Sequence, residues 1–324
     1  MLENLLDPLF LFFVVGFAGG VLRSDLKLPD AVYQLLSTYL LLAIGLKGGV
    51  QLAQVSAGEI VMPALATLGL GLFVPVVVFA VAMRIGKLGR ADAASLAAHY
   101  GSASAVTFAA GLEMVRRAQM QHEGFLPVLL VLLEIPAILV AIFLHRSGAK
   151  AASVASESGK AGESYGAIVH EILLNRSVFL LLAGMAVGFL SGPGRFASFE
   201  PLFVHAFKPI LAFFILEMGL VAAQRMPEIK KAGVFLVTFG IVCPLIVGAL
   251  GGWLGLLSGL SQGGAVILAT MAASASYIAA PAAIRVAIPE ANTGLSIAAA
   301  LGVTFPFNLA LGIPLYMWWV GRIG

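Results

Sequence analysis

The stretch "MAASASYIAAPAAIRVA", residues 271–287, places two serines, a tyrosine and a proline inside a long apolar run. The stretch "HYGSASAVTFAAGL", residues 99–112, has the same character. Small residues loosen a helix and permit close backbone approach, and Pro281 removes one backbone hydrogen bond. In lipid, that loss is tolerated only where protein or water supplies a partner. Both stretches therefore predict interrupted helices beside a polar pocket; the alternative for each is close helix packing without an interruption.

The composition predicts an all-α membrane protein. Of the 324 residues, 60% are hydrophobic and 11% are charged, which no soluble domain accommodates. A membrane span needs about 20 mostly apolar residues. Ten transmembrane helices are predicted, at residues 8–22, 31–53, 60–84, 91–115, 125–145, 175–191, 202–222, 232–257, 263–287 and 294–320.

Lysine and arginine predict the orientation of these spans. Thirteen of them flank the odd-numbered connections, against four in the termini and the even-numbered connections. The positive-inside rule then puts the odd-numbered connections in the cytoplasm and both termini on the outer side of the plasma membrane.

The two halves of the chain resemble each other. "GFAGGVL" at 16–22 matches "GMAVGFL" at 184–190, and "GSAS" at 101–104 matches "ASAS" at 273–276, at offsets of 168 and 172 residues. These matches predict a first five-helix repeat at 1–145, a cytoplasmic linker at 146–170 and a second repeat at 171–324. Because five is odd, the second copy must be inverted, as in many secondary transporters.

The inverted repeat would bring the two small-residue stretches to the same depth. The N-terminus of a half-helix offers free N–H groups and a partial positive charge to an anion. The hydroxyls of Ser102, Ser104, Ser274 and Ser276 would add hydrogen-bond donors. Neither "GSAS" at 101–104 nor "ASAS" at 273–276 contains lysine or arginine, which favours a small, singly charged anion over phosphate. Lys47, in the second span, is expected to extend to the membrane surface.

Glu134 lies at the centre of the fifth span, where a carboxylate costs at least about 2.5 kcal/mol to insert. It must face a cavity or a partner. With the carbonyls freed by Pro136, its oxygens suit sodium; Thr304 and Asn308 in the tenth span would add neutral oxygens. The alternative is a protonated Glu134, or one hydrogen-bonded to a neighbouring helix. Co-transport of sodium would offset the roughly 2.3 kcal/mol per 100 mV that opposes anion entry.

"HYGSASAVTFAAGL", "LEIPAILVAI" and "SASYIAAPAA", with the break after the fifth span, resemble the sodium-dependent bicarbonate transporters first known from cyanobacteria. The resemblance implies a gate domain (spans 1, 2, 6 and 7), a core domain (spans 3–5 and 8–10), elevator-like motion and a homotrimer. It implies bicarbonate binding by Gly101, Ser102, Ala103, Ser104, Ser274, Ala275, Ser276 and Tyr277.

Two residues depart from the family pattern. Glu134 stands where aspartate is expected, and Ala273 where glycine is common. Some family members bind a cytoplasmic PII-like regulator; the linker here is short, and residues 165–176 would be its docking helix.

The sequence therefore predicts a secondary transporter that imports bicarbonate with sodium, needs no cofactor beyond that coupling ion and binds no nucleic acid. It carries no phosphate loop, nucleophile elbow or paired-histidine zinc helix, so an enzyme is not expected. Its single cysteine, Cys243, excludes an intrachain disulfide. Alternatives are a symporter or exchanger for another small monovalent anion, a cation/proton antiporter that uses Glu134, and a receptor, scaffold or intramembrane enzyme.

Overall fold

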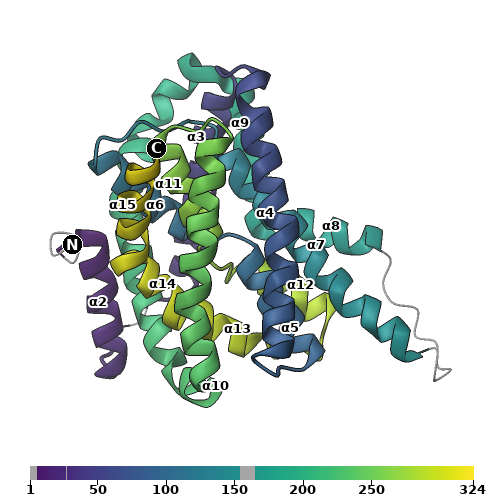
Figure 1. Ribbon diagram of the computed structural model, residues 1–324. Coiled ribbons are helices and arrows are strands. Elements are labelled where there is room, and N and C mark those ends of the chain that lie inside the picture. Colours follow the sequence, from purple (N-terminus) through teal and green to yellow (C-terminus); the bar gives the residue numbers. More distant parts are fainter. Residues whose placement is uncertain (1–5, 27, 154–164) are drawn as a thin grey trace.

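The computed structural model describes residues 6–26, 28–153 and 165–324, and every regular element in that part of the chain is helical (Figure 1). The first half contains α2 (Pro8–Val21), α3 (Asp30–Leu52), α4 (Ala57–Arg84), α5 (Arg90–Gly101), α6 (Ala105–Arg117) and α7 (Leu126–Ser153). The second half contains α8 (Tyr165–Leu174), α9 (Arg176–Phe196), η1 (Ala197–Phe199), η2 (Pro201–His205), α10 (Phe207–Leu257), α11 (Gln262–Ala272), α12 (Ala279–Ala287), α13 (Thr293–Ala299), η3 (Ala300–Thr304), α14 (Phe305–Phe307), η4 (Asn308–Gly312) and α15 (Ile313–Ile323).

Seven helical stretches within the described residues are long and apolar enough to cross a membrane. They correspond to the second, third, fifth, sixth, seventh, eighth and tenth predicted spans. Gly233, with φ 76° and ψ 175°, divides α10 between the seventh and eighth. Of the other three, the first is the short apolar helix α2, and the fourth and ninth are each broken into two shorter helices. An all-helical membrane fold is confirmed, while the number ten stays a prediction.

Helices enter both ends of the predicted linker, residues 146–170. Helix α7 continues to Ser153, and α8 begins at Tyr165 within the segment proposed as a docking helix. Residues 154–164 lie outside the described part of the chain.

One group of helices packs backbone to backbone through glycine. A Cβ on Gly49 of α3 would lie 2.1 Å from the Met185 carbonyl oxygen of α9, and a Cβ on Gly16 of α2 would lie 1.9 Å from that of Leu216 in α10. Only glycine permits such approach, as in other tightly packed membrane helices. We call α2, α3, α9 and residues 207–232 of α10 the first bundle.

The second bundle comprises α4–α7, residues 234–257 of α10, α11–α15 and the short segments η3 and η4 among them; α8, η1 and η2 are assigned to neither bundle. Helices α4, α5 and α7 pack on one another, and α11 packs on α6, α7, α10 and α15. The second part of α10 contacts this bundle through Gly240, against Val303, and Gly251, against Ala272. The break at Gly233 therefore lets α10 contribute to both bundles.

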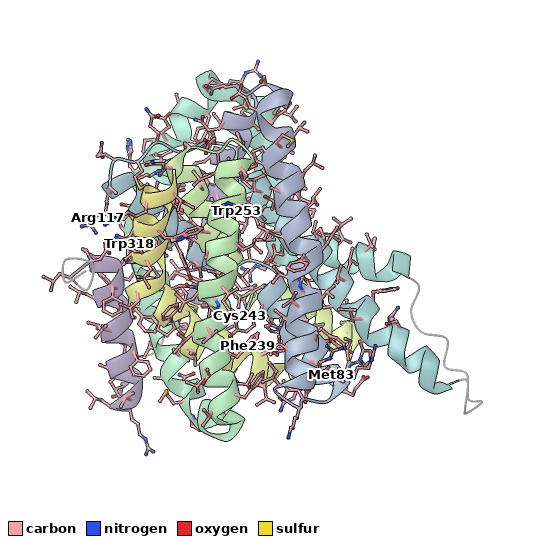
Figure 2. The ribbon with its side chains drawn as sticks, viewed as in Figure 1. Met83, Arg117, Phe239, Cys243, Trp253 and Trp318 are labelled. Atoms are coloured by element: carbon pink, nitrogen blue, oxygen red, sulfur yellow. The ribbon has the colours of Figure 1, made fainter. Side chains whose placement is uncertain are left out.

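The outer faces of the long helices are apolar. Phe73 on α4, Ile246 and Trp253 on α10 and Trp318 on α15 are each at least about half exposed, and side chains of these helices project outward in Figure 2. Such continuous apolar exposure suits contact with lipid rather than water.

Candidate substrate site at two helix breaks

The first break separates α5 from α6, at the position predicted from "GSAS". Ser102 has an extended backbone (φ −97°, ψ 169°), and its Oγ donates a 2.6 Å hydrogen bond to the Ala98 carbonyl in the last turn of α5. The Ser104 Oγ accepts a 3.1 Å hydrogen bond from the Thr107 N–H and so caps α6. One serine thus ends the first half-helix and the other begins the second.

The second break, between α11 and α12, uses its serines in the same way. The Ser274 Oγ donates to the Met271 carbonyl at 2.7 Å, and the Ser276 Oγ accepts from the Ala280 N–H at 3.2 Å. Pro281 lies in the first turn of α12, where a helix has no internal acceptor for an N–H. The proline therefore does not remove a bond from the helix interior, contrary to the sequence-based interpretation.

The two breaks touch each other. The Ser104 N–H donates a 2.8 Å hydrogen bond to the Ser274 Oγ, and the Ser276 N–H donates one of 2.8 Å to the His99 carbonyl. In Figure 1, α5, α12 and α13 accordingly lie together in the lower part of the molecule. The structure thus joins stretches that are 170 residues apart.

The amide groups at these breaks are only partly satisfied. The N–H groups of Ala105 and Val106 at the start of α6, and of Ala279 at the start of α12, find no acceptor in the described part of the chain. The expected role of the hydroxyls needs correction. The hydroxyls of Ser102 and Ser274 already donate hydrogen bonds to helix carbonyls. The donors left free at the breaks are therefore mainly backbone N–H groups.

All eight candidate substrate-binding residues are buried. Gly101 packs against α4, where a Cβ would lie 2.4 Å from the Pro75 ring, so its small size serves helix packing. The Tyr277 hydroxyl is buried and lies close enough to the Ser104 hydroxyl to interact with it, and the Tyr277 ring meets Phe305 edge to face. A void of about 10 Å³ beside the breaks is lined by Ala105, Ile278 and residues of α3, so in this conformation the site is closed.

The carboxyl group of Glu134 reaches the second break. Glu134 is 4% exposed, and its side chain lies close enough to the Ser276 hydroxyl to interact with it. A buried carboxyl group is thus placed beside the cap of α12.

Thr304 and Asn308 support the site from the tenth span. The Asn308 Nδ2 donates a 2.8 Å hydrogen bond to the Ala273 carbonyl at the second break. The Thr304 Oγ1 lies 2.7 Å from the Tyr100 hydroxyl and donates to the Gly240 carbonyl at 2.7 Å. Both lie at ends of π-helical segments, η3 and η4, a distortion frequent at functional sites. The contacts link Asn308 to the second break and Thr304 to α5 and α10.

Comparison of the sequence with known protein families identifies the family of this chain. A family model described as the Na+-dependent bicarbonate transporter superfamily matches residues 8–321. The chain belongs to the Na+-dependent bicarbonate transporter superfamily. No curated protein matches it. Membership identifies a multi-pass membrane protein of a transporter family and implies transport rather than catalysis.

Two further buried polar side chains, His99 and Tyr316, lie beside the breaks of this superfamily member. His99 is fully buried; its Nδ1 lies 2.7 Å from the Ser95 carbonyl, and its Nε2 has no partner among the described residues. The Tyr316 hydroxyl is 3.1 Å from Asn308 Oδ1 and 3.0 Å from the Pro244 carbonyl. In the sequence, only the position of "HY" directly before "GSAS" indicates that His99 lies near a break. No local pattern indicates this for Tyr316.

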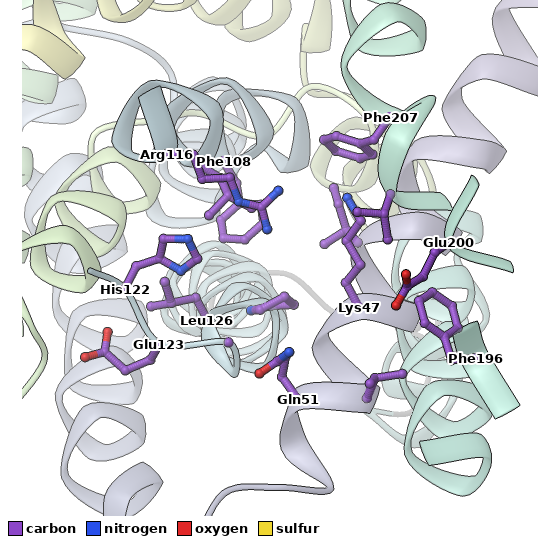
Figure 3. A pocket seen from close by; sticks show the side chains of 16 residues that line it. Lys47, Gln51, Phe108, Arg116, His122, Glu123, Leu126, Phe196, Glu200 and Phe207 are labelled. Carbon is purple, nitrogen blue, oxygen red and sulfur yellow. The ribbon is translucent and has the colours of Figure 1, made fainter. Parts of the chain in front are cut away.

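The sequence-based expectation for Lys47 is wrong. Its Nζ is buried, lies 3.9 Å from the centre of the Phe207 ring, and has no hydrogen-bond partner in the described residues. Lys47 lines a cavity of about 320 Å³ whose walls come from both bundles (Figure 3). Lys47 therefore lines this cavity, with its ammonium group covered by the Phe207 ring rather than extended to the membrane surface.

Proposed function

We propose that the protein imports bicarbonate together with sodium by elevator-like alternating access. Membership in the superfamily supports this substrate pair. The observation that carries the proposal is the contact between the two helix breaks through Ser104 and Ser274, 170 residues apart. Two half-helices begin there, and each N-terminus carries roughly half a positive charge.

The chemistry of the breaks suits a singly charged oxyanion. Residues 101–105 and 273–279 contain no lysine or arginine, so backbone N–H groups and dipoles would supply the positive potential. Gly101, Ser102, Ala103 and Ser104 would hold bicarbonate from one side, and Ser274, Ala275, Ser276 and Tyr277 from the other. A dianion such as phosphate would demand a stronger positive field than these dipoles offer.

Sodium would bind beside the anion. Glu134 contributes a buried carboxyl group next to Ser276, and hard oxygen ligands of this type suit sodium. We assign Thr304 and Asn308 as further oxygen donors, with the amide of Asn308 also fixing the Ala273 carbonyl. A cation next to an anion lowers the charge that must cross the membrane potential.

The architecture proposed for this mechanism has ten transmembrane helices in a five-plus-five inverted repeat, residues 1–145 and 171–324. Equivalent serines at the two breaks play equivalent roles, which supports the repeat. The first bundle corresponds to the gate domain and the second to the moving core domain. We place the protein in the plasma membrane as a homotrimer with both termini outside, and α8 as the docking helix for any cytoplasmic PII-like regulator.

Uptake of labelled bicarbonate into proteoliposomes, with and without an inward sodium gradient, tests the proposal. We expect uptake to require the gradient. Sodium-independent uptake would remove the symport, and uptake of a different monovalent anion in place of bicarbonate would reassign the substrate. Proton-coupled cation flux without anion uptake would favour an antiporter that uses Glu134.

A further inference from the structure

The cavity of about 320 Å³ lies on the face of α6 that begins at the first break. Phe108, Leu112 and Arg116 follow one another at intervals of four residues in α6, which places each one turn beyond the last on the same side of the helix. These three residues line the cavity, together with Lys47 on α3. The cavity therefore begins one helical turn from the cap of α6 and extends away from it.

Ile44 connects this cavity to the candidate substrate site. It lines both the large cavity and the void of about 10 Å³, whose wall also includes Ala105 and Ile278 at the two breaks. Such a void is at the lower limit for one water molecule. The large cavity and the breaks are thus neighbouring compartments with Ile44 between them.

Two basic residues of opposite bundles line the cavity. Figure 3 shows Lys47 on one wall and Arg116 on the facing wall. A buried ammonium group without a hydrogen-bond partner is costly. Contact between Lys47 and the Phe207 ring offsets only about 0.5–2 kcal/mol of this cost. A carboxylate in direct contact with Lys47 is missing from the described residues, although Glu113 lies near enough to act on its charge.

The acidic side chains nearby do not supply that partner. Glu123 points away from the centre of the cavity in Figure 3, and its Oε1 accepts a 2.7 Å hydrogen bond from the Ser261 N–H. Glu113 pairs with Lys208 at 2.5 Å and acts on Lys47 and Arg116 only at longer range. Glu200 lines the cavity and is exposed. Among the described residues, no carboxylate forms an ion pair with Lys47 or Arg116.

We propose that this cavity is a second anion site, which receives the transported monovalent oxyanion from water before it passes Ile44 to the helix breaks. Lys47 and Arg116 would hold the anion between the two bundles. The cavity exceeds the size of a four-atom oxyanion such as bicarbonate, so the anion would enter with part of its water. This inference rests on the proposed function, because it assumes that an anion is the cargo.

Cysteine labelling tests the site independently of transport. Gln51 is exposed and lines the cavity, and Cys243 is the only native cysteine. The Gln51→Cys variant, in a Cys243→Ser background, is treated with an anionic sulfonatoethyl or a cationic trimethylammonioethyl methanethiosulfonate. The rate at which each reagent modifies the introduced cysteine is divided by the rate at which the same reagent modifies a free thiol in solution. We expect the anionic reagent to be favoured by about fivefold or more, as nearby positive charges require.

Substitutions at Lys47 test whether this residue causes the preference for the anionic reagent. Lys47→Met should remove most of it, and Lys47→Arg should retain it. Arg322→Met is the matched control, because Arg322 also lies over an aromatic ring, that of Trp318, but outside the cavity; it should leave the preference unchanged. Equal reactivity of the two reagents, or a preference that survives Lys47→Met, would overturn the proposal.

Uptake kinetics separate this inference from the proposed function. In proteoliposomes that accumulate bicarbonate, Lys47→Met should raise the KM for bicarbonate about tenfold and leave the maximal rate within about twofold, since it removes ground-state binding. Arg322→Met should change neither. A wild-type KM in Lys47→Met overturns the second site but not the transport function. Absence of bicarbonate uptake by the wild type overturns the transport function, and the labelling ratio still decides whether the cavity attracts anions.

Discussion

The Ser104 N–H group donates a 2.8 Å hydrogen bond to the Ser274 hydroxyl across 170 residues of sequence. Ser104 caps α6 with its own hydroxyl, and Ser274 donates its proton to the end of α11. One contact therefore links the start of a half-helix in the first part of the chain to the end of a half-helix in the second. It fixes the relative position of the two breaks at which we propose that bicarbonate binds.

Ser274→Ala should destabilise the protein and impair uptake. The Ser104 amide is buried, and an amide that loses its acceptor costs about 1–3 kcal/mol. Thermal unfolding in detergent should show a lower midpoint, and uptake should fall. Ser177→Ala is the matched control, because Ser177 is equally buried and its hydroxyl has no partner among the described residues. Equal midpoints for the two variants would mean that the Ser104–Ser274 bond adds no stability.

Glu134→Gln should weaken the activation of uptake by sodium. The substitution keeps the shape of the side chain but removes the charge that would neutralise sodium. We expect the sodium concentration for half-maximal uptake to rise by about tenfold or more, and Glu134→Asp to restore part of the affinity. Glu59→Gln, at the exposed start of α4, is the control. If sodium activates Glu134→Gln as it activates the wild type, Glu134 does not bind sodium and has only a structural role.

A cross-link between Glu113→Cys and Lys208→Cys should stop transport reversibly. The two native side chains form an ion pair between α6 of the second bundle and α10 of the first, and Asp7 pairs with Arg117 between the same bundles. Elevator motion must break both pairs. Uptake is measured in the Cys243→Ser background before and after treatment with a bifunctional methanethiosulfonate, which joins the two cysteines through disulfides. It is measured again after a reductant has cleaved these disulfides.

The control for this cross-link is His145→Cys with Glu290→Cys. That native pair, at 3.0 Å, lies within the second bundle, so joining it should leave uptake intact. Unchanged uptake with the 113–208 link in place would exclude a relative movement of the bundles.

Gly49→Ala should destabilise the first bundle. The new Cβ would lie 2.1 Å from the Met185 carbonyl oxygen, so α3 and α9 would have to separate, at a cost of roughly 1–3 kcal/mol. Gly69→Ala in α4 meets nothing within 4 Å and should be neutral, or stabilising by up to about 1 kcal/mol. Unfolding midpoints measured side by side check the difference in sign. A Gly49→Ala midpoint at or above that of the wild type would contradict the close packing.

Stability should fall as the pH drops below about 6.5, in part through His122. Burial lowers the pKa of His122 below its ordinary 6.5, Arg116 lowers it further, and Glu123 acts in the opposite direction. The folded protein therefore resists protonation of His122 while the unfolded chain binds the proton, so acid favours unfolding. The unfolding midpoint of His122→Gln should depend less on pH between 7 and 5. An equal slope would assign the pH dependence to other groups.

The sequence by itself determined which segments are helical and where two of them break. The predicted span 31–53 became Asp30–Leu52, and both breaks fall at the predicted serines, because hydropathy and small-residue content act locally. It also carried the family signature. Glu134 was singled out for the same local reason, since a carboxylate in an apolar span is expensive wherever the helix lies.

Only the tertiary structure decided what those residues meet. That the Ser104 amide finds the Ser274 hydroxyl, and that Asn308 holds the Ala273 carbonyl, depends on contacts between distant segments. Lys47 was misplaced because its position along α3 indicates depth but not which neighbour it faces. The close glycine contacts between α3 and α9 fix the rotation of α3. This rotation places Lys47 at the cavity between the bundles, with its ammonium group against the Phe207 ring.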